Sequence, residues 1–490
     1  MIKSAAITRL FLFTLLTGFL LRILWLSHFP VFTDEAIYAH WAQGLVNGTL
    51  SPFISISDGK TPLFIWAIAA VVKLGIPYTL AGRILSACGF IGTALFIYLL
   101  SKKTMKGFWI VVPTFLYALS PFTLFFERMG LMDSLLTFFS TGFLYFTYLF
   151  LTKKNSMYRV LLASLFLSLA FMTKPSALLF VYTSTLIPLL YIFIDKKKAL
   201  YSLLLVIPTL FILFLLSRSS GFSAYSFKNM EFTYPLTTDW QILLNNLIMN
   251  IKTLAPAFAL YFLPVLILFP FALYYLTTEK QYELLLQILL YMLIPVGIVM
   301  VFGRIVFSRY FLSFVPLIFF AQGYTLMHIS NAKNSLVKRG LLGISLFGTL
   351  LYFAYGSSMT LTDPSHAFLS KQDRWQYITS TASGFGMTES IDFIKKMQTE
   401  ATIVTTQDFG NLPYIFDFAF EHEPKITIKG TWTQNPKTIQ SEMSNIDTPL
   451  YVVYNLPLKD MPKSSTTLKQ LFAYTRPGNI SGIRIFELIR

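Results

Sequence analysis

The sequence predicts an all-α polytopic membrane protein of about eleven transmembrane helices, followed by a small α/β domain. Of the 490 residues, 55% are hydrophobic and 17% are aromatic, whereas only 13% are charged. The mean hydropathy is +0.61. A soluble domain could not cover its surface with so few polar residues, so most of the chain must lie in a bilayer.

The apolar residues come in runs of the length that a spanning helix needs, which is about 20 residues. These runs cover about 7–27, 80–100, 108–124, 132–152, 159–173, 176–194, 199–216, 250–277, 284–302, 309–328 and 336–356. The 250–277 run carries Pro256, Pro264 and Pro270. Proline removes a helical hydrogen bond, so we expect this run to be kinked or broken.

The basic residues orient the predicted helices. With the N-terminus inside, every short loop rich in lysine and arginine falls on the inner side, as expected for cytoplasmic loops. These loops contain Lys102, Lys103, Lys106, Lys153, Lys154, Arg159, Lys196, Lys197, Lys198, Lys280, Lys333, Lys338 and Arg339. This distribution accounts for the net charge of +16 without a nucleic-acid partner. It predicts a multi-pass membrane protein with its N-terminus inside.

The same orientation places four segments outside: 28–62, 120–131, 217–248 and everything after about residue 357. Within the last segment, residues 388–397 predict a helix with Thr388 as a possible N-cap. ATIVTT, KITIKG, PLYVVYNL and SGIRIFELI predict short strands. We therefore expect a membrane domain at 1–357 and an extracytoplasmic α/β domain at 358–490.

The first outer loop, at 28–62, carries charges beside an apolar chain and is the first candidate site. Helical spacing places Asp34 and Tyr38 on one face, with Glu35 adjacent. A carboxylate at the membrane surface can act as a general base toward an acceptor hydroxyl. Asp34 could also simply stabilise the first turn of an interfacial helix, with Thr33 as its cap.

Further charges lie at predicted helix ends on the same outer face. Asp133 could be a functional acid with Arg128 as its partner or as a phosphate ligand, or it could cap its helix. Lysine next to the membrane suits a lipid-linked phosphate, although Lys60 could also snorkel. The same two interpretations apply to the remaining basic residues on this face. They are Arg83, Lys174 and Arg309.

Other chemistries find little support in the sequence. The single cysteine, Cys88, excludes a disulfide framework, and the five histidines show no metal-ligand spacing. There is no P-loop and no dinucleotide fingerprint, so a nucleotide-driven pump is not indicated.

Six motifs in this order resemble the GT-C superfamily of glycosyltransferases over about residues 20–320. They read FxDEAIYAxWA, GKTPLF, GRILSA, SPFxxxFxRxxLMDSxLxFF, LAFMTKPSAL and SRYFLSFVP. They are most similar to the protein O-mannosyltransferase-like group, which includes the lipid A aminoarabinose transferases. That group often has a double proline where this chain has Lys60-Thr61-Pro62, and the tail after 357 matches no family.

The resemblance implies an inverting enzyme that takes a sugar from a polyprenyl or dolichyl monophosphate to an acceptor hydroxyl outside the cytoplasm. Asp34 matches the expected base, Glu35 the acid beside it and Asp133 a second acid. Lys60 matches the lysine near the donor phosphate, and Arg83, Lys174 and Arg309 lie in similar contexts. No metal is required, although a divalent cation could bind between the first-loop acids and the phosphate.

Two other interpretations stay open. A transporter or flippase of lipid-linked sugars would show paired halves with interrupted helices and no large outer domain. An inactive relative that binds glycans through its tail would not need acids at Asp34 and Asp133. The sugar, the acceptor and the oligomeric state do not follow from the sequence.

Overall fold

The computed structural model describes residues 4–152, 157–219, 221–331, 336–397 and 399–489. The chain divides into two compact units. The first comprises Met1–Leu26, Gly44–Ile76 and Leu80–Ser370, and the second comprises Ser27–Gln43, Pro77–Thr79 and Lys371–Arg490. The division differs from the single cut expected after residue 357, because part of the first outer loop packs with the tail.

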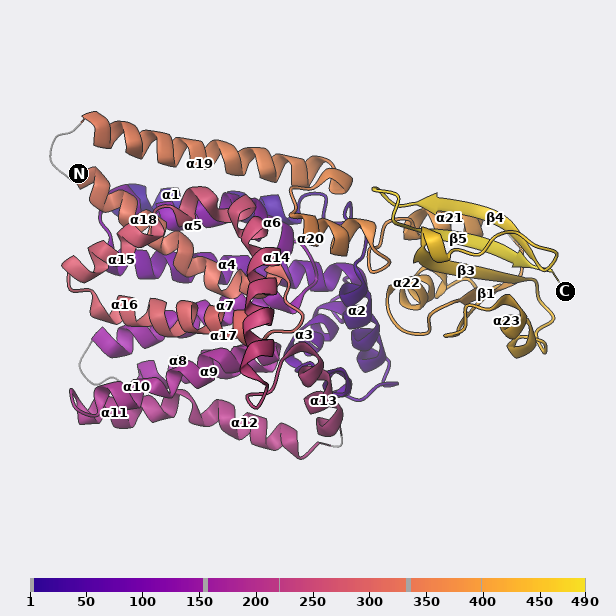
Figure 1. Cartoon of the computed structure of the whole chain (residues 1–490), viewed down its shortest axis with the longest axis horizontal. Helices are drawn as coiled ribbons and strands as arrows, with labels where there is room; N and C mark the ends of the chain where they lie inside the picture. Colours follow the sequence, from indigo (N-terminus) through magenta and orange to yellow (C-terminus); the bar gives the residue numbers. More distant parts are fainter. Residues whose placement is uncertain (1–3, 153–156, 220, 332–335, 398, 490) are drawn as a thin grey trace. The chain divides into compact units, whose positions relative to one another are not determined.

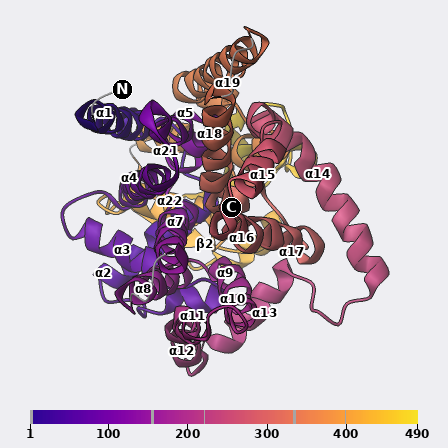
Figure 2. The same cartoon turned by 90° about the vertical axis from the view of Figure 1, so that its left-hand side faces the viewer.

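The first unit is a bundle of apolar helices (Figures 1 and 2). Within the described residues, seven helical segments are long and apolar enough to cross a membrane. They are α1 (Ser4–Ile23), α4 (Tyr78–Thr104), α7 (Met132–Thr152), Lys196–Ser217, α14 (Trp240–Leu266), Tyr282–Phe302 and Ser308–Ser330. Shorter apolar segments are α3 (Leu63–Val72), α8 (Met157–Thr173) and Pro175–Tyr191, and α19 spans Leu336–Thr362. The polytopic helical class is confirmed.

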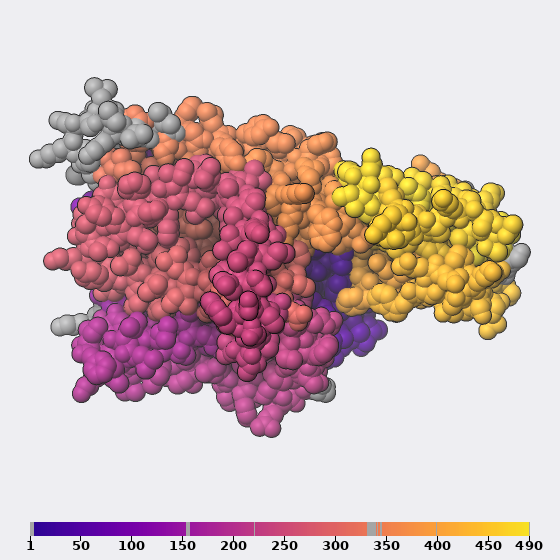
Figure 3. Space-filling model, viewed as in Figure 1, coloured from indigo at the N-terminus to yellow at the C-terminus, as the bar shows by residue number. Residues whose placement is uncertain are grey.

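Several of the expected spans are interrupted, among them 108–124 and 250–277. The 108–124 run forms η2 (Gly107–Ile110), α5 (Val112–Leu119) and α6 (Pro121–Phe126), and proline at the start of α6 ends the preceding helix. The 250–277 run is broken as expected, into α14 and α15 (Phe269–Thr278), although α14 accommodates two internal prolines. Figure 3 shows α14 on the surface of this unit.

Segments between the spans are also helical. The expected loop at 217–248 contains α13 (Phe222–Phe232), which the sequence analysis did not predict. In Figure 1 the start of α1, the turn between α10 (Leu186–Tyr191) and α11 (Lys196–Ser202), and the turn between α15 and α16 (Tyr282–Ile288) lie at the same end of the first unit. Lys196–Lys198 begin α11, and Lys280 lies in the α15–α16 turn. Lys153, Lys154 and Lys333, which the orientation also uses, lie outside the described residues.

Small residues bring α4 against the start of α7. A Cβ atom added to Gly89 would lie 2.6 Å from the Ser134 hydroxyl oxygen. That hydroxyl donates to the Ser86 carbonyl at 2.6 Å, and the Ser86 hydroxyl donates to the Leu131 carbonyl at 3.2 Å. Small residues permit close approach between membrane helices, so this contact fixes where α7 begins.

The second unit contains a five-stranded sheet with the order β2-β1-β3-β5-β4. Its strands are β1 (Ala401–Thr405), β2 (Ile426–Gly430), β3 (Leu450–Pro457), β4 (Leu468–Thr475) and β5 (Ser481–Leu488). β1 runs parallel to β2 and β3, whereas β5 is antiparallel to β3 and β4. The four expected strands are confirmed, and β4 was not expected. Helix α21 (Met387–Met397) already begins before Thr388, so Thr388 is not its N-cap.

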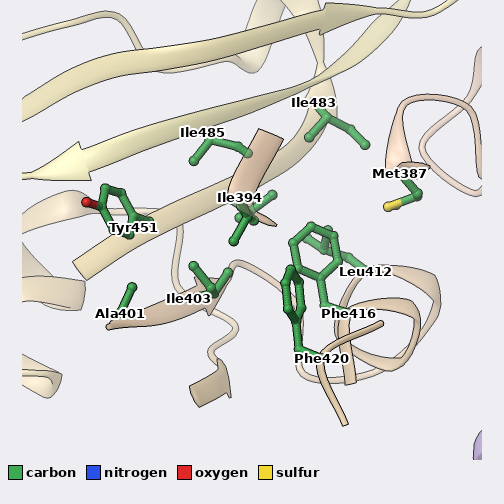
Figure 4. Close-up of a cluster of buried hydrophobic side chains, with 11 residues drawn as sticks. Met387, Ile394, Ala401, Ile403, Leu412, Phe416, Phe420, Tyr451, Ile483 and Ile485 are labelled. Carbon is green, nitrogen blue, oxygen red and sulfur yellow. The ribbon is translucent and has the colours of Figure 1, made fainter. Parts of the chain in front are cut away.

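Helices cover both faces of this sheet. On one face, α21 and α22 (Asn411–Phe420) pack Ile394 and Phe416 against Ile403 of β1 (Figure 4). On the other face, α23 (Pro436–Glu442) packs Ile439 against Val404. The connections β1–α22–β2 and β2–α23–β3 therefore pass on opposite faces. The carboxyl ends of β1 and β3 form the topological switch point of the sheet, where open α/β sheets usually bind ligands.

Helix α2 (Thr33–Val46) packs on the tail within the second unit. The His40 ring stacks on the Tyr414 ring with 3.8 Å between centroids. At the C-terminal end of the helix, the Gln43 amide donates to the Glu421 carboxylate at 2.9 Å. The predicted first-loop acids are thus carried by a helix that belongs structurally to the second unit.

Candidate active site

An ion pair joins the start of α7 to the end of α8. The Lys174 ammonium lies 2.5 Å from Oδ1 of Asp133, whose side chain is 5% exposed. Lys174 precedes Pro175, and the residue before a proline favours an extended backbone. The extended conformation of Lys174 ends α8 and starts the short helix η3 (Pro175–Ala177). The local sequence therefore places this lysine between two helix ends.

An aromatic ring lies beside this ion pair. Helix η6 (Ser308–Phe314) packs against α7 and contributes Tyr310, whose ring centroid is 4.5 Å from the Lys174 ammonium. The neighbouring Arg309 is buried, and its guanidinium lies 5.7 Å from the same ring centroid. Lys174 and Arg309 therefore both lie near the Tyr310 ring. Lysine and arginine are side chains that bind phosphate groups.

Lys60 lies in a different loop of the first unit and pairs with Asp58. This loop follows η1 (Ile54–Asp58), and Gly59 turns the chain with a φ of +71°. Helix α13 packs on the loop, because the Asn229 amide donates to the Gly59 carbonyl at 3.1 Å. Lys60 is partly exposed at 24%. Helix α13, in the segment expected to be a loop at 217–248, thus supports the loop that carries Lys60, the lysine predicted to lie near the donor phosphate.

Glu127 belongs to a buried network at the end of α1. Arg22 and Glu127 form an ion pair at 2.7 Å with both side chains 0% exposed. The Tyr117 hydroxyl donates to the other carboxylate oxygen at 2.5 Å, and Arg22 also donates to Thr123. Because the carboxylate and the guanidinium are both well hydrogen-bonded, this pair ties α1 to α5 and α6 as a structural contact.

Arg128 binds the end of α1. Its guanidinium donates to the carbonyls of Leu21, Leu24 and Trp25 at 2.6, 2.7 and 3.1 Å. Burial and repulsion from Arg83 and Arg22 lower the pKa of Arg128 to about 10, so it stays charged at neutral pH. Arginine commonly satisfies terminal helix carbonyls. This provides a structural role for a residue predicted to bind donor phosphate.

Arg83 also contacts the segment that follows α1. It is 2% exposed, and its Nη1 donates to the Leu26 carbonyl at 2.6 Å. A buried arginine in an apolar helix needs such partners. The alternative in which Arg83 snorkels to the surface does not describe this geometry. Its role toward a donor phosphate stays a prediction.

The first-loop acids begin α2. Glu35 is 4% exposed, and its Oε2 accepts a hydrogen bond from the backbone N–H of Phe32 at 2.9 Å. This contact is one half of a capping box, in which the third residue of a helix satisfies the N-cap amide. The N-cap is therefore Phe32 and not Thr33. Asp34 is partly buried in the first turn, and Tyr38 is 4% exposed.

The structure thus brings some of the predicted site residues together and places others in a different unit. Asp133 and Lys174 form an ion pair in the first unit, and Lys174 and Arg309 both lie near Tyr310, which sequence reasoning did not select. Its only signal was its position beside Arg309. Asp34, Glu35 and Tyr38 belong to the second unit. Across the described ranges, no group of three or more His, Cys, Asp or Glu side chains could hold a metal ion.

Comparison with solved structures assigns the fold. No protein-family model and no curated protein sequence matches the chain. ArnT from Cupriavidus metallidurans, solved with bound undecaprenyl phosphate, is similar over 98% of both chains with a TM-score of 0.62 and 12% identity. The apo structure of the same protein is similar with a TM-score of 0.60 and 13% identity.

A second solved protein with this fold is an oligosaccharyltransferase. The archaeal oligosaccharyltransferase AglB from Archaeoglobus fulgidus, in complex with an inhibitory peptide and a dolichol-phosphate, has a TM-score of 0.54 and 11% identity. The similarity covers 92% of this chain and 70% of that chain. Both neighbours are GT-C superfamily glycosyltransferases. The resemblance in the motifs is therefore matched in three dimensions, and the chain has the GT-C fold.

Proposed function

We propose that this protein is an inverting glycosyltransferase that uses a polyprenyl monophosphate sugar. The sugar passes to an acceptor hydroxyl on the extracytoplasmic face of the plasma membrane. The observation that carries the proposal is the Lys174–Asp133 ion pair at helix ends inside a GT-C fold, with Arg309 near the same tyrosine ring as Lys174. An apolar helical unit with basic side chains at its helix ends suits a lipid that ends in a phosphate.

The neighbouring structures support the class of donor. ArnT was solved bound to undecaprenyl phosphate, and AglB was solved in complex with a dolichol-phosphate. Those lipids are polyprenyl-type chains with one terminal phosphate. We infer the same donor class for this chain, with the sugar and the acceptor left undefined.

The proposed reaction is a single displacement. The acceptor oxygen attacks the anomeric carbon while Asp34 takes the hydroxyl proton. The bond from that carbon to the lipid phosphate oxygen breaks, and the phosphate leaves with the bonding electrons. Lys60, Lys174 and Arg309 offset the charge that develops on the phosphate. Inversion follows because no second carboxylate acts as a nucleophile.

Transfer assays in purified membranes test this proposal with a panel of radiolabelled polyprenyl-phosphate sugars. We expect transfer by the wild type, and a loss in Asp34→Asn with donor binding retained. Lys174→Ala should lower transfer about 100-fold, the usual effect of removing one group that stabilises developing charge. Lys280→Ala is the matched control, because Lys280 is exposed in the turn between α15 and α16. Wild-type transfer by Asp34→Asn would remove Asp34 as the base.

A flippase is the second candidate, favoured by the break between α14 and α15 and by the π-helix η5 (Leu289–Leu293). Interrupted helices are a feature of transporters. Proteoliposomes that carry a fluorescent polyprenyl-phosphate sugar separate the two functions. Movement of the lipid across the bilayer, without transfer from any donor, would replace the glycosyltransferase proposal.

A further inference from the structure

The N-terminus of α2 is joined to one backbone carbonyl of the tail. Both the backbone N–H and the hydroxyl of Thr33 donate to the Ala382 carbonyl, at 3.1 and 2.8 Å. A Cβ atom added to Gly384 would lie 2.3 Å from the Val31 carbonyl oxygen. No side chain fits between these two backbones. The residue after Thr33 is Asp34, so this contact lies directly beside the first-loop acid.

The segment that receives Thr33 is itself held by buried side chains. The Asn411 amide nitrogen lies 3.4, 3.2 and 3.2 Å from the carbonyls of residues 381, 382 and 383. The Asn455 amide donates to the carbonyl of residue 381 at 2.9 Å. Arg476 donates to the carbonyl of residue 383 at 3.1 Å. All three side chains are 2% exposed or less.

Two of these side chains lie at the switch point of the sheet. Asn455 is near the carboxyl end of β3, and Asn411 follows the loop that leaves β1. Open α/β sheets usually bind their ligands there. In this unit the amide groups at that position bind the chain's own segment 381–383 instead. That segment then holds the start of α2.

We propose that Thr33 and Asn411 are positioning residues for Asp34, acting through the Ala382 carbonyl. The proposal rests on the proposed function, in which Asp34 is the general base. A base must lie within hydrogen-bond reach of the acceptor hydroxyl, and misplacement by about 1 Å can cost about 100-fold in rate. Segment 381–383 of the second unit therefore contributes to catalysis by fixing the helix that carries the base.

Thr33→Val tests this, because it keeps the shape and the backbone N–H but removes the hydroxyl donor. We expect kcat to fall about ten-fold with the donor KM unchanged, and Thr33→Ser to restore it. Asn411→Ala should act in the same direction. Gly384→Ala should lower kcat about 100-fold by displacing the chain before α2. Gln43→Ala is the matched control, since it removes a contact at the other end of the same helix.

Hydrogen exchange of the amides in the first turn of α2 supplies a readout apart from activity. We expect faster exchange there in Thr33→Val and Asn411→Ala, and unchanged exchange in the sheet. Wild-type kcat in Thr33→Val and Gly384→Ala, with Asp34→Asn inactive, would overturn the positioning role and leave the proposed function standing. An equal fall in Gln43→Ala would also overturn it. Full transfer by Asp34→Asn would reject both proposals, whatever the exchange shows.

Discussion

Replacing Arg128 by lysine separates the two roles that this residue can have. The sequence predicts a ligand of the donor phosphate, whereas the structure shows a guanidinium that donates to three carbonyls at the end of α1 at 3.1 Å or less. Lysine keeps the positive charge but presents its donors from one nitrogen. It can reach a phosphate as a point charge, but it cannot span the carbonyls of Leu21, Leu24 and Trp25.

The cost of this replacement follows from the bonds that are lost. One guanidinium nitrogen, Nη1, makes the contacts to Leu21 and Leu24, and Nη2 makes the contact to Trp25. The single nitrogen of lysine can therefore retain two of the three short contacts, so one is lost. A hydrogen bond to a charged group contributes about 1.5–3 kcal/mol. Arg128→Lys should therefore lower the free energy of unfolding by about 1.5–3 kcal/mol, while the affinity for polyprenyl phosphate in the folded protein stays the same.

Detergent-solubilised protein allows both quantities to be measured. Unfolding in a titration with denaturing detergent, followed by tryptophan fluorescence, reports stability. Equilibrium binding of a polyprenyl phosphate at low temperature reports affinity. Arg9→Lys is the control, because Arg9 is an exposed arginine of α1, the helix whose end Arg128 contacts. Unchanged stability together with weakened lipid binding would refute the structural assignment and support the role in phosphate binding.

Three other perturbations have defined outcomes. Glu127→Gln should destabilise the protein by about 3–5 kcal/mol, because it leaves Arg22 buried without an opposite charge. The double variant Arg22→Met with Glu127→Leu should recover most of that loss. An equal free energy of unfolding in the wild type and Glu127→Gln would contradict this. Burial raises the pKa of Asp417 to about 6 from 3.8. The folded state then holds a proton that the unfolded state releases, so stability should fall as pH rises from about 4 to about 6. In thermal unfolding, Asp417→Asn should lose this pH dependence and should be about 1–2 kcal/mol more stable than the wild type at pH 7, after allowance for screening. A wild-type stability that does not change over this pH range would contradict the prediction. Gly59→Ala should lower kcat/KM for the donor about ten-fold, because a Cβ at φ +71° would lie 2.8 Å from a side chain of α13. Gly75→Ala, also at positive φ but in open space, should leave it unchanged.

Hydrophobic patterning predicted the parts of the fold that depend on apolar length or on alternation. The runs at 80–100 and 132–152 correspond to α4 and α7, and the alternating segments of the tail correspond to four strands. α3 was missed because ten residues are too few for a span. β4 was missed because LKQLFAYT mixes exposed and buried positions without strict alternation.

The candidate site was predictable in residue type but not in grouping. Patterns of charge at helix ends found Asp133 and Lys174, which the structure joins in one ion pair. The same patterns selected Arg128, whose contacts with backbone carbonyls have no sequence signature. They also placed Thr33 at the cap of α2, whereas its hydroxyl binds a carbonyl 349 positions away in the chain. Such tertiary contacts lie beyond any local pattern.

The separation of 349 positions between Thr33 and Ala382 has a consequence for biogenesis. Synthesis proceeds from the N-terminus, so α2 forms long before the residues that hold it exist. Contacts between such distant positions form late and slowly. The first-loop helix must therefore wait, undocked, until the last quarter of the chain has been made. A nascent or truncated chain without the tail would hold the first-loop acids and still lack the segment that fixes their helix.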